Sequence, residues 1–338
     1  MPKSILEELA GVLGKTASTE FEVTRFIDTG YAPLNKRISG LYRDGYPQGR
    51  IIEMFGPSMC GKTALATLAM KAAIDDGGFA MFHDHERSFD IGLAENLGLD
   101  HESGRFVHLK PDTLEESFMI CMNTATNIRD KGLIPADAPI ICVFDSLAAM
   151  VPQSKMKKEL DMLTMADSLA LAKATSTTFP VLKMRCEKDN ICAIILNQIR
   201  ENPTQTHGDN TRTPGGKAPA FYADVRVSMK AKTMREGDKP DGKARPDLGS
   251  NVTAQVIKTK LTAPFQQAGW QFKFNPDGSG HFDILGGLIE ECCTVGIMKK
   301  AGSYITFKGE NKYKKDWREI LKPEDLTAAL IASETPSA

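Results

Sequence analysis

The middle of the chain alternates short, almost continuously apolar segments with longer segments of helical periodicity. Continuous apolar runs are typical of parallel strands covered on both faces, and their alternation with helices is typical of an α/β sheet. We therefore predict an α/β fold whose central, mostly parallel, twisted sheet is flanked by helices. The predicted strands are Arg50–Phe55, Phe79–Asp84, Ile140–Asp145 and Ile191–Asn197.

Two later segments, Asp224–Lys230 and Thr253–Lys260, alternate apolar and polar residues with a period of two, which predicts half-exposed strands. The segment between them, Thr233–Ser250, is rich in Lys, Gly, Pro and Asp and indicates a hairpin connection. At the N-terminus, an apolar stripe between Ser4 and Leu13 predicts a short amphipathic helix. This helix packs either on its own core or on a neighbouring subunit, and the stripe alone leaves both open.

These patterns divide the chain into four parts. We predict an N-terminal helix and strand over residues 1–33, a large α/β core over 34–272, a small α+β domain over 273–323 and a tail over 324–338. The composition is 41% hydrophobic and 25% charged, which is typical of globular proteins. The formal charge of −1 excludes a strongly basic total but leaves room for local basic patches.

The seven cysteines show no zinc-binding spacing, and no apolar run approaches the roughly 18 residues of a membrane span. The N-terminus also lacks a signal-peptide pattern. We therefore expect a soluble cytoplasmic protein with reduced thiols and no membrane partner.

A phosphate-binding loop is the strongest motif. The segment GPSMCGKT matches G-x-x-x-x-G-K-[ST] in full, follows a predicted strand and precedes a predicted helix. Its glycines let successive N–H groups point at phosphate oxygens, and the helix N-terminus favours an anion. The competing interpretation is a glycine-rich turn with a solvated lysine. We predict that ATP is bound by Gly56, Pro57, Ser58, Met59, Cys60, Gly61, Lys62 and Thr63, with Lys62 at the β- and γ-phosphates.

Cys60 is an unusual residue within such a loop. Beside Lys62 and a helix N-terminus, its thiol pKa should be lowered if the side chain is accessible. We expect its alkylation to block nucleotide binding.

Three polar residues end predicted strands at the edge where the loop lies. Asp145 is predicted to hold Mg²⁺ together with Thr63, and Gln198 to lie near the γ-phosphate. Glu86 is predicted to polarise the attacking water, against the plainer interpretation of an ordinary strand-end carboxylate. A metal site formed by His83, Asp84, His85 and Glu86 is disfavoured, because neighbouring side chains of a strand point to opposite faces. The polar segment Glu201–Ala220 follows Gln198 and is expected to move with it.

Together these motifs resemble the RecA-type homologous recombinases of bacteria and phages. The resemblance runs from about Val23 to Leu321. The matching segments are Gly49–Pro57, Gly61–Thr63, Phe144–Ala149, Asn197–Arg200, Thr213–Gly216, Ala218–Arg226, Lys258–Phe265 and Lys300–Tyr304.

The resemblance implies residue roles. Glu86 is implied as the catalytic glutamate, Gln198 as the γ-phosphate sensor, and Lys258 and Lys260 as lysines that reach the ATP of the neighbouring subunit. Asp90 is implied at the adenine.

The resemblance also bears on the adenine contact and on the subunit interface. Leu93 stands where the family usually has an aromatic ring against the adenine, so we predict that Phe274 stacks there instead. The resemblance also implies Phe221 at the subunit interface and the N-terminal helix on the next subunit.

DNA contacts are implied for two loops, at about 153–167 and 201–217. Local charge adds a C-terminal basic run in which Tyr304, Tyr313 and Trp317 are interleaved. We predict that it captures duplex DNA, against the plainer interpretation of a solvated surface. The predicted DNA-binding residues are Lys173, Arg200, Arg212, Gly215, Gly216, Lys217, Arg226, Lys312, Lys314 and Lys315.

The resulting hypothesis is an ATP- and Mg²⁺-dependent recombinase that forms helical filaments on single-stranded DNA and exchanges strands with a homologous duplex. Single-strand-binding and loader proteins are possible partners. The competing hypotheses are a ring-shaped ATPase of the same fold, a small-molecule phosphotransferase, and a nucleotide-gated DNA scaffold without turnover.

Overall fold

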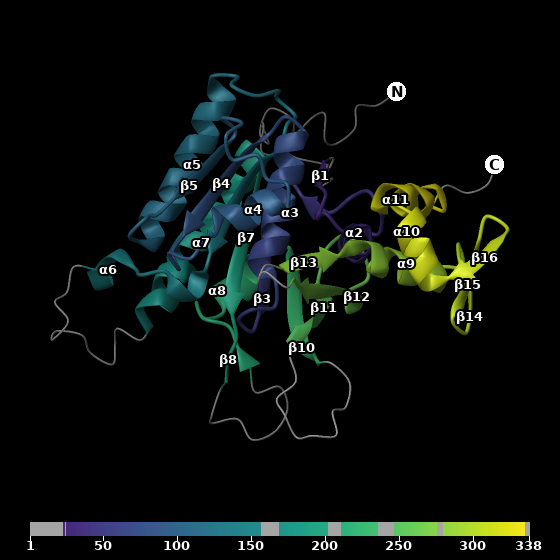
Figure 1. The fold of residues 1–338 in the computed structure, drawn as a ribbon. Coiled ribbons are helices and arrows are strands. Elements are labelled where there is room, and N and C mark those ends of the chain that lie inside the picture. The colour runs from purple at the N-terminus through teal and green to yellow at the C-terminus, as the bar shows by residue number, and fades with distance from the viewer. Residues whose placement is uncertain are drawn as a thin grey trace, which may run out of the picture.

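The computed structural model describes residues 23, 25–156, 169–201, 211–235, 247–275 and 280–334. Within these ranges, the centre of the molecule is a twisted sheet of nine strands with helices on both faces (Figure 1). Six neighbouring strands are parallel, and three more are added antiparallel at one edge. The predicted α/β class with a mostly parallel central sheet is confirmed.

The parallel strands include all four apolar segments predicted first, each matched to within one residue. In the middle of the sheet these strands are almost wholly buried, as expected when helices cover both faces. In chain order they are β3 (Ile51–Gly56), β4 (Phe79–Asp84), β5 (Phe106–Leu109), β6 (Ile140–Asp145), β7 (Ile191–Gln198) and β10 (Val225–Arg235). Across the sheet the order is β10-β3-β7-β6-β4-β5.

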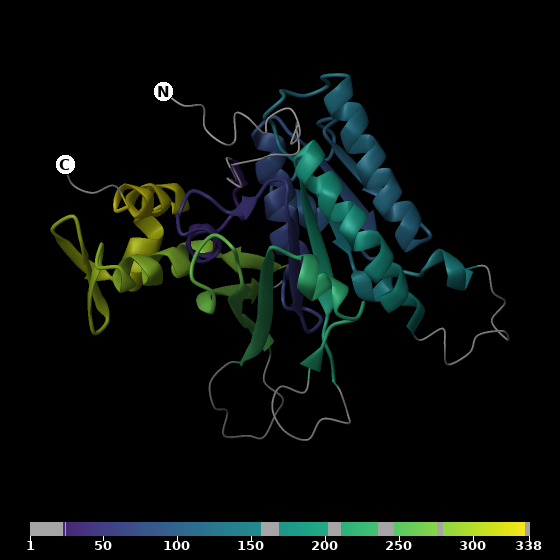
Figure 2. The same ribbon diagram turned by 180° about the vertical axis from the view of Figure 1, so that it is seen from behind.

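Long helices supply the two faces: α3 (Lys62–Asp75), α5 (Leu114–Asp130) and α7 (Ala170–Asp189). The helices α5 and α7 lie side by side on one face (Figure 2), and α3 covers the other. Because side chains alternate along a strand, the neighbours Ile51 and Ile52 belong to separate cores, with Ile51 beneath α5 and α7 and Ile52 beneath α3.

The antiparallel edge consists of β11 (Asp247–Lys258), β12 (Gln266–Phe274) and β13 (Gly280–Asp283). The two predicted half-exposed strands correspond to β10 and β11, which pair antiparallel, while β10 also pairs parallel with β3. Most of the connection predicted between them, residues 236–246, lies outside the described residues.

Short elements surround this sheet. In chain order they are β1 (Phe26–Ile27), α2 (Ala32–Ser39), β2 (Tyr46–Pro47), α4 (Ile91–Asn96), η2 (Leu147–Ala149), α6 (Gln153–Met156), β8 (Arg200–Glu201), β9 (Thr211–Arg212) and α8 (Ala218–Tyr222).

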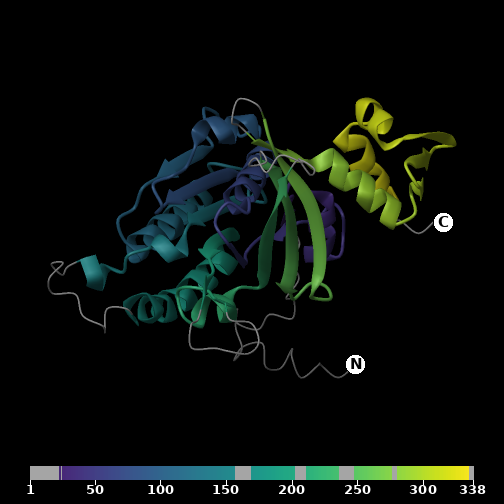
Figure 3. The ribbon, with the colours of Figure 1, turned by 60° about the horizontal axis from the view of Figure 1, so that its bottom comes forward.

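A C-terminal lobe stands beside the antiparallel edge (Figure 3). Trp317 anchors its interior, since it is buried and donates a 2.7 Å hydrogen bond from Nε1 to the carbonyl of Ile305. The predicted domain boundaries stay predictions. The lobe consists of α9 (Ile284–Thr294), β14 (Lys299–Ala301), β15 (Tyr304–Phe307), β16 (Glu310–Tyr313), α10 (Lys314–Ile320) and α11 (Pro323–Ala332).

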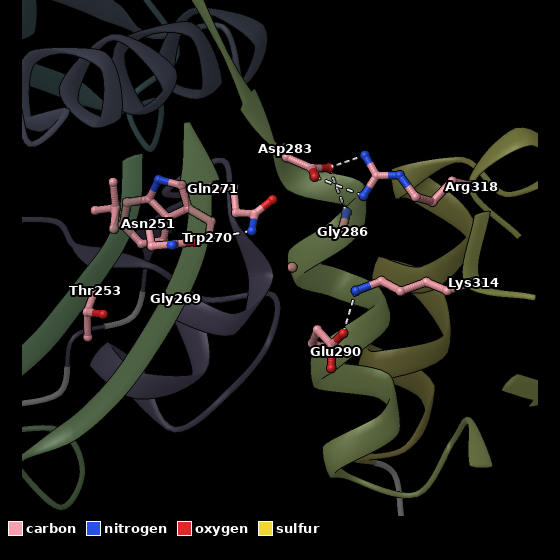
Figure 4. A pocket seen from close by; sticks show the side chains of 12 residues that line it. Asn251, Thr253, Gly269, Trp270, Gln271, Asp283, Gly286, Glu290, Lys314 and Arg318 are labelled. Carbon is pink, nitrogen blue, oxygen red and sulfur yellow. Dashed lines mark hydrogen bonds and ion pairs between the residues drawn. The ribbon is translucent and has the colours of Figure 1, made fainter. Parts of the chain in front are cut away.

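A cleft of about 320 Å³ separates β11 and β12 from α9 and α10 (Figure 4). At its edge Arg318 donates two hydrogen bonds to Asp283, at 2.8 and 2.7 Å, and Lys273 donates a third at 2.7 Å. Burial opposes the charge of Asp283, but these bonds hold its pKa well below the usual range. The ion pairs therefore fasten α10 to the point where β13 passes into α9.

Several predictions concern residues outside the described ranges: the N-terminal amphipathic helix, residues 157–168 of the first predicted DNA loop and residues 202–210 of the second. In the part of the chain that is described, no helix has both the length and the apolar character needed to cross a membrane.

Candidate active site

Four strand ends bring the predicted polar residues to one edge of the sheet. The phosphate loop follows β3, Glu86 lies just after β4, Asp145 ends β6 and Gln198 ends β7. Because these strands are parallel, their carboxyl ends meet at the edge where open α/β sheets bind ligands.

The curl of the phosphate loop depends on two glycines. A Cβ at Gly56 would come within 2.4 Å of the Met229 carbonyl oxygen, and Gly61 has a φ of +82°, which disfavours other residues. The helix α3 begins at Lys62 without a side-chain cap, so its first N–H groups are available to an anion. Lys62 Nζ donates to the carbonyl of Pro57 at 2.8 Å, which holds the ammonium within the loop.

Thr63 and Asp145 form a pair of oxygen donors beside this loop. Thr63 Oγ1 donates a 2.7 Å hydrogen bond to Asp145 Oδ2. Burial raises the pKa of Asp145 to about 6, although the hydrogen bond from Thr63 opposes the shift. A hydroxyl and a carboxylate at this spacing fit Mg²⁺, which binds few protein oxygens and takes its other ligands from phosphates and water. The two residues predicted to hold the metal are thus brought together.

Glu86 is held by two hydrogen-bond donors. Gln198 Nε2 donates to Glu86 Oε1 at 2.9 Å, and Ser146 Oγ donates to the same oxygen. The backbone N–H of Glu86 also donates to the carbonyl of Asp145 at 3.1 Å. Since both side-chain bonds fall on Oε1, they orient the carboxylate and leave Oε2 to another partner.

One cavity of about 770 Å³ joins these groups. This volume lies within the range of small-molecule sites, and β10, β11 and β12 supply the wall opposite the phosphate loop. The predicted residues that line it are Pro57, Ser58, Met59, Cys60, Gly61, Lys62, Thr63, Glu86, Asp145, Gln198 and Phe274.

The adenine end of the predicted site is only partly reproduced. Asp90 is absent from the residues that line the cavity; its Oδ1 instead accepts a 3.0 Å hydrogen bond from the N–H of Leu93 and caps α4. Leu93 itself lines the cavity, as does Phe274, whose side chain is 41% exposed. These two residues supply apolar surface on which a flat ring can pack.

The expectation for the Cys60 thiol needs correction. Its condition, an accessible side chain, is not met, since Cys60 is 0% exposed. Burial raises the thiol pKa, and the charge of Lys62 only partly opposes this effect. The charge of a neighbouring lysine lowers a thiol pKa, but desolvation by the surrounding core raises it more. The sequence pattern alone therefore did not predict the reactivity correctly.

Lys258 and Lys260 do not line this cavity and lie instead near α8. Lys258 Nζ donates to the carbonyls of Ala220 and Phe221, each at 2.9 Å, while Lys260 Nζ lies 3.1 Å from Asp224 Oδ1. Burial, together with the charge of Lys260, lowers the pKa of Lys258. Phe221, the predicted interface residue, is 74% exposed.

The root of the second predicted DNA loop carries two arginines. Arg200 and Arg212 are exposed cross-strand partners in the small sheet of β8 and β9. Like charges directly opposite each other destabilise a strand pair, so this placement favours an anion between or above them.

The rest of this predicted DNA surface lies along α7. Thr175 Oγ1 donates a 2.7 Å hydrogen bond to the carbonyl of Gly215, and a Cβ at Gly216 would come within 2.9 Å of the Ala172 Cβ. Lys173 and Lys217 are both exposed beside this contact. The structure therefore brings these four predicted residues together.

Arg226 and the C-terminal lysines have partners within the chain. Arg226 Nε donates to the buried carboxylate of Glu53 at 2.6 Å, so its predicted DNA contact finds no support in this geometry. Lys314 pairs with Glu290 in the cleft of Figure 4. Lys312 pairs with Glu310 and lies 4.9 Å from the ring centroid of Trp317, and Lys315 lies 5.9 Å from that of Tyr313.

Other contributors were not identified from the sequence. Ser146 directly follows the predicted metal ligand Asp145, so its place near the site could have been predicted from the sequence. No sequence pattern pointed to the residues that β10, β11 and β12 contribute, because these strands are distant in the chain from the phosphate loop. These residues are Ala231, Thr233, Ser250, Val252 and Phe272.

Comparison with known proteins gives consistent matches. A family model described as the RecA N-terminal domain matches residues 10–278. Protein RecA of Clostridioides difficile (strain 630) is 33% identical over 298 residues, covering 87% of this chain and 76% of the relative. Protein RecA of Heliobacterium modesticaldum is 30% identical over 297 residues, covering 86% and 77%. A crystal structure of the RadB recombinase matches 75% of this chain and 98% of its own, with a TM-score of 0.46 and 18% identity.

Proposed function

The chain belongs to the RecA family, and on that premise we propose that it is an ATP-dependent recombinase that forms filaments on single-stranded DNA and exchanges strands. Family membership supports an ATPase that acts in DNA recombination or repair. The finer proposal is supported by one observation: Gln198 contacts the candidate catalytic Glu86 and ends β7 just before the second predicted DNA loop.

Bound Mg²⁺-ATP supplies the anhydride to be hydrolysed and the cation that neutralises its charge. The protein's own contribution is positioning. The phosphate loop and Lys62 would hold the phosphates, and Thr63 and Asp145 would hold the cation. Glu86, fixed through Oε1 by Ser146 and Gln198, accepts a proton from water.

DNA binding is proposed for the surface at the loop root. It combines the exposed cations Arg200, Arg212, Lys173 and Lys217 with the glycines that fit against α7. Such a surface recognises phosphates with little regard to sequence, so base pairing would provide the specificity. The C-terminal lobe is proposed as a weaker site for duplex DNA.

The proposed subunit arrangement is supported by the position of two lysines. Lys258 and Lys260 lie away from their own nucleotide cavity, which supports their action on the cavity of an adjacent subunit. A head-to-tail interface of this kind repeats into an open filament unless its rotation closes a ring.

The experiment is strand exchange between a circular single strand and a homologous linear duplex, with and without ATP. We expect joint molecules only with ATP. Glu86→Gln should bind ATP and DNA normally while its hydrolysis falls on the order of 10²-fold or more. Hydrolysis by this variant at the wild-type rate would contradict the proposed role of Glu86.

A further inference from the structure

A buried carboxylate near the end of the second predicted DNA loop binds two lysines. Asp224 lies between α8 and β10 with its side chain 4% exposed. Lys183 of α7 pairs with its Oδ2, and Lys260 Nζ lies 3.1 Å from its Oδ1. Burial alone would raise the pKa of Asp224, but the two lysines lower it overall.

The backbone keeps this carboxylate in place. The N–H of Asp224 donates to the carbonyl of Ile51 at 2.8 Å, and the N–H of Ile51 donates to Asp224 Oδ2 at 3.3 Å. Asp224 is thereby tied to the start of β3, the strand that leads to the phosphate loop. It is a fixed group to which a mobile side chain can return.

The two lysines are unequal partners. Lys183 is 22% exposed and balances the charge of Asp224 on its own, whereas Lys260 is 67% exposed and makes a second ion pair to a carboxylate already compensated. Exposed ion pairs contribute little free energy. Lys260 can therefore leave without exposing a buried, uncompensated charge.

Lys258 is bound to the same segment, through the carbonyls of Ala220 and Phe221. Residues 220–224 thus hold both lysines and directly follow the second predicted DNA loop. The other end of that loop is attached to Gln198, which contacts Glu86.

We propose that Asp224 is a positioning residue that docks Lys260 within its own subunit, and that assembly on DNA transfers Lys260 to the nucleotide of the next subunit. This inference rests on the proposed function, because it assumes that Lys260 acts across the interface. Lys183 is the permanent partner that makes the transfer reversible. Docking lowers activity before assembly, and displacement of residues 220–224 releases the lysine.

The direct test measures acetylation of Lys260 by an amine-reactive ester, followed by mass spectrometry, on the free protein without nucleotide. Asp224→Asn should raise the acetylation rate of Lys260 several-fold. Lys183→Met should lower it, since Asp224 then has Lys260 as its remaining lysine. Glu187→Gln is the matched control. It removes a carboxylate that lines one cavity with Lys183, Asp224 and Lys260 but pairs with Arg50, and it should leave the rate unchanged.

An unchanged rate in Asp224→Asn overturns the proposal. If that variant fails to fold, Lys183→Met decides alone, and an unchanged or faster rate in it overturns the proposal. Asp224→Glu should restore slow acetylation, which distinguishes docking from a packing effect. Failure of the proposed function is separate: Lys260→Ala would then retain wild-type DNA-stimulated ATPase, whatever the acetylation rates.

Discussion

Gln198 donates a 2.9 Å hydrogen bond to Glu86, across two strand ends that are 112 residues apart in the chain. The proposed γ-phosphate sensor, Gln198, and the proposed general base, Glu86, therefore orient each other's side chains. On the proposed function, an incoming γ-phosphate would offer the Gln198 amide a second acceptor, and a move toward it would shift the root of the predicted DNA loop. Such a two-position side chain can couple nucleotide binding to DNA binding.

Replacing Gln198 by Ala should separate these two events. ATP affinity should change little, because the phosphate loop is intact, while the ATP-dependent gain in single-stranded DNA affinity should fall about tenfold. Fluorescence anisotropy of a labelled oligonucleotide, with ATP and with ADP, measures that gain. An undiminished gain would show that the coupling bypasses Gln198.

The pKa of Asp145 predicts a pH-dependent stability. Its folded value is raised from 3.8 to about 6, so ionisation disfavours the folded state. This free-energy cost is absent below the pKa of the unfolded state and complete above the pKa of the folded state. Asp145→Asn should converge on the wild-type stability as the pH falls below about 4 and exceed it by about 1–3 kcal/mol above pH 6. Denaturant unfolding in Mg²⁺-free buffer measures this difference, and a pH-independent difference would contradict it.

Alkylation of the native protein should spare Cys60. The thiol is fully buried and its pKa is raised, so iodoacetamide should react with it at least about tenfold more slowly than with the partly exposed Cys293. Peptide mass spectrometry over time gives both rates, and ATP binding should survive once Cys293 is modified. Loss of binding that tracks modification of Cys60 would restore the earlier expectation.

Arg200 and Arg212 should make phosphate contacts with single-stranded DNA. Each substitution by Ala should reduce the slope of log affinity against log salt concentration by roughly 0.7. Arg129→Ala is unsuitable as a control because it breaks internal hydrogen bonds, whereas Lys188→Ala removes an exposed cation from the far end of α7. A slope as steep as the wild type in the double variant would remove these arginines from the DNA site.

The sequence predicted the strand-end groups well, and for a physical reason. Parallel strands bring their carboxyl ends to one edge, so Asp145 and Gln198 could be placed together without knowledge of the loops. The reactivity of Cys60 and the contacts of Arg226 depend on burial and on partners from distant strands. The two ion pairs of Asp224 could not be predicted for the same reason: Lys183 lies 41 residues before it, and Lys260 lies just beyond the end of β11.

The central claim is that each active cavity is completed by a neighbouring subunit, and mixing two inactive variants tests it most directly. Lys260→Ala retains its own Glu86, and Glu86→Gln retains its lysines. In an equal mixture on single-stranded DNA, roughly one quarter of the interfaces join an intact Glu86 to an intact Lys260. We predict that DNA-dependent ATPase recovers to about that fraction of the wild-type rate. A mixture that assembles on DNA and stays as inactive as either variant alone would contradict the account.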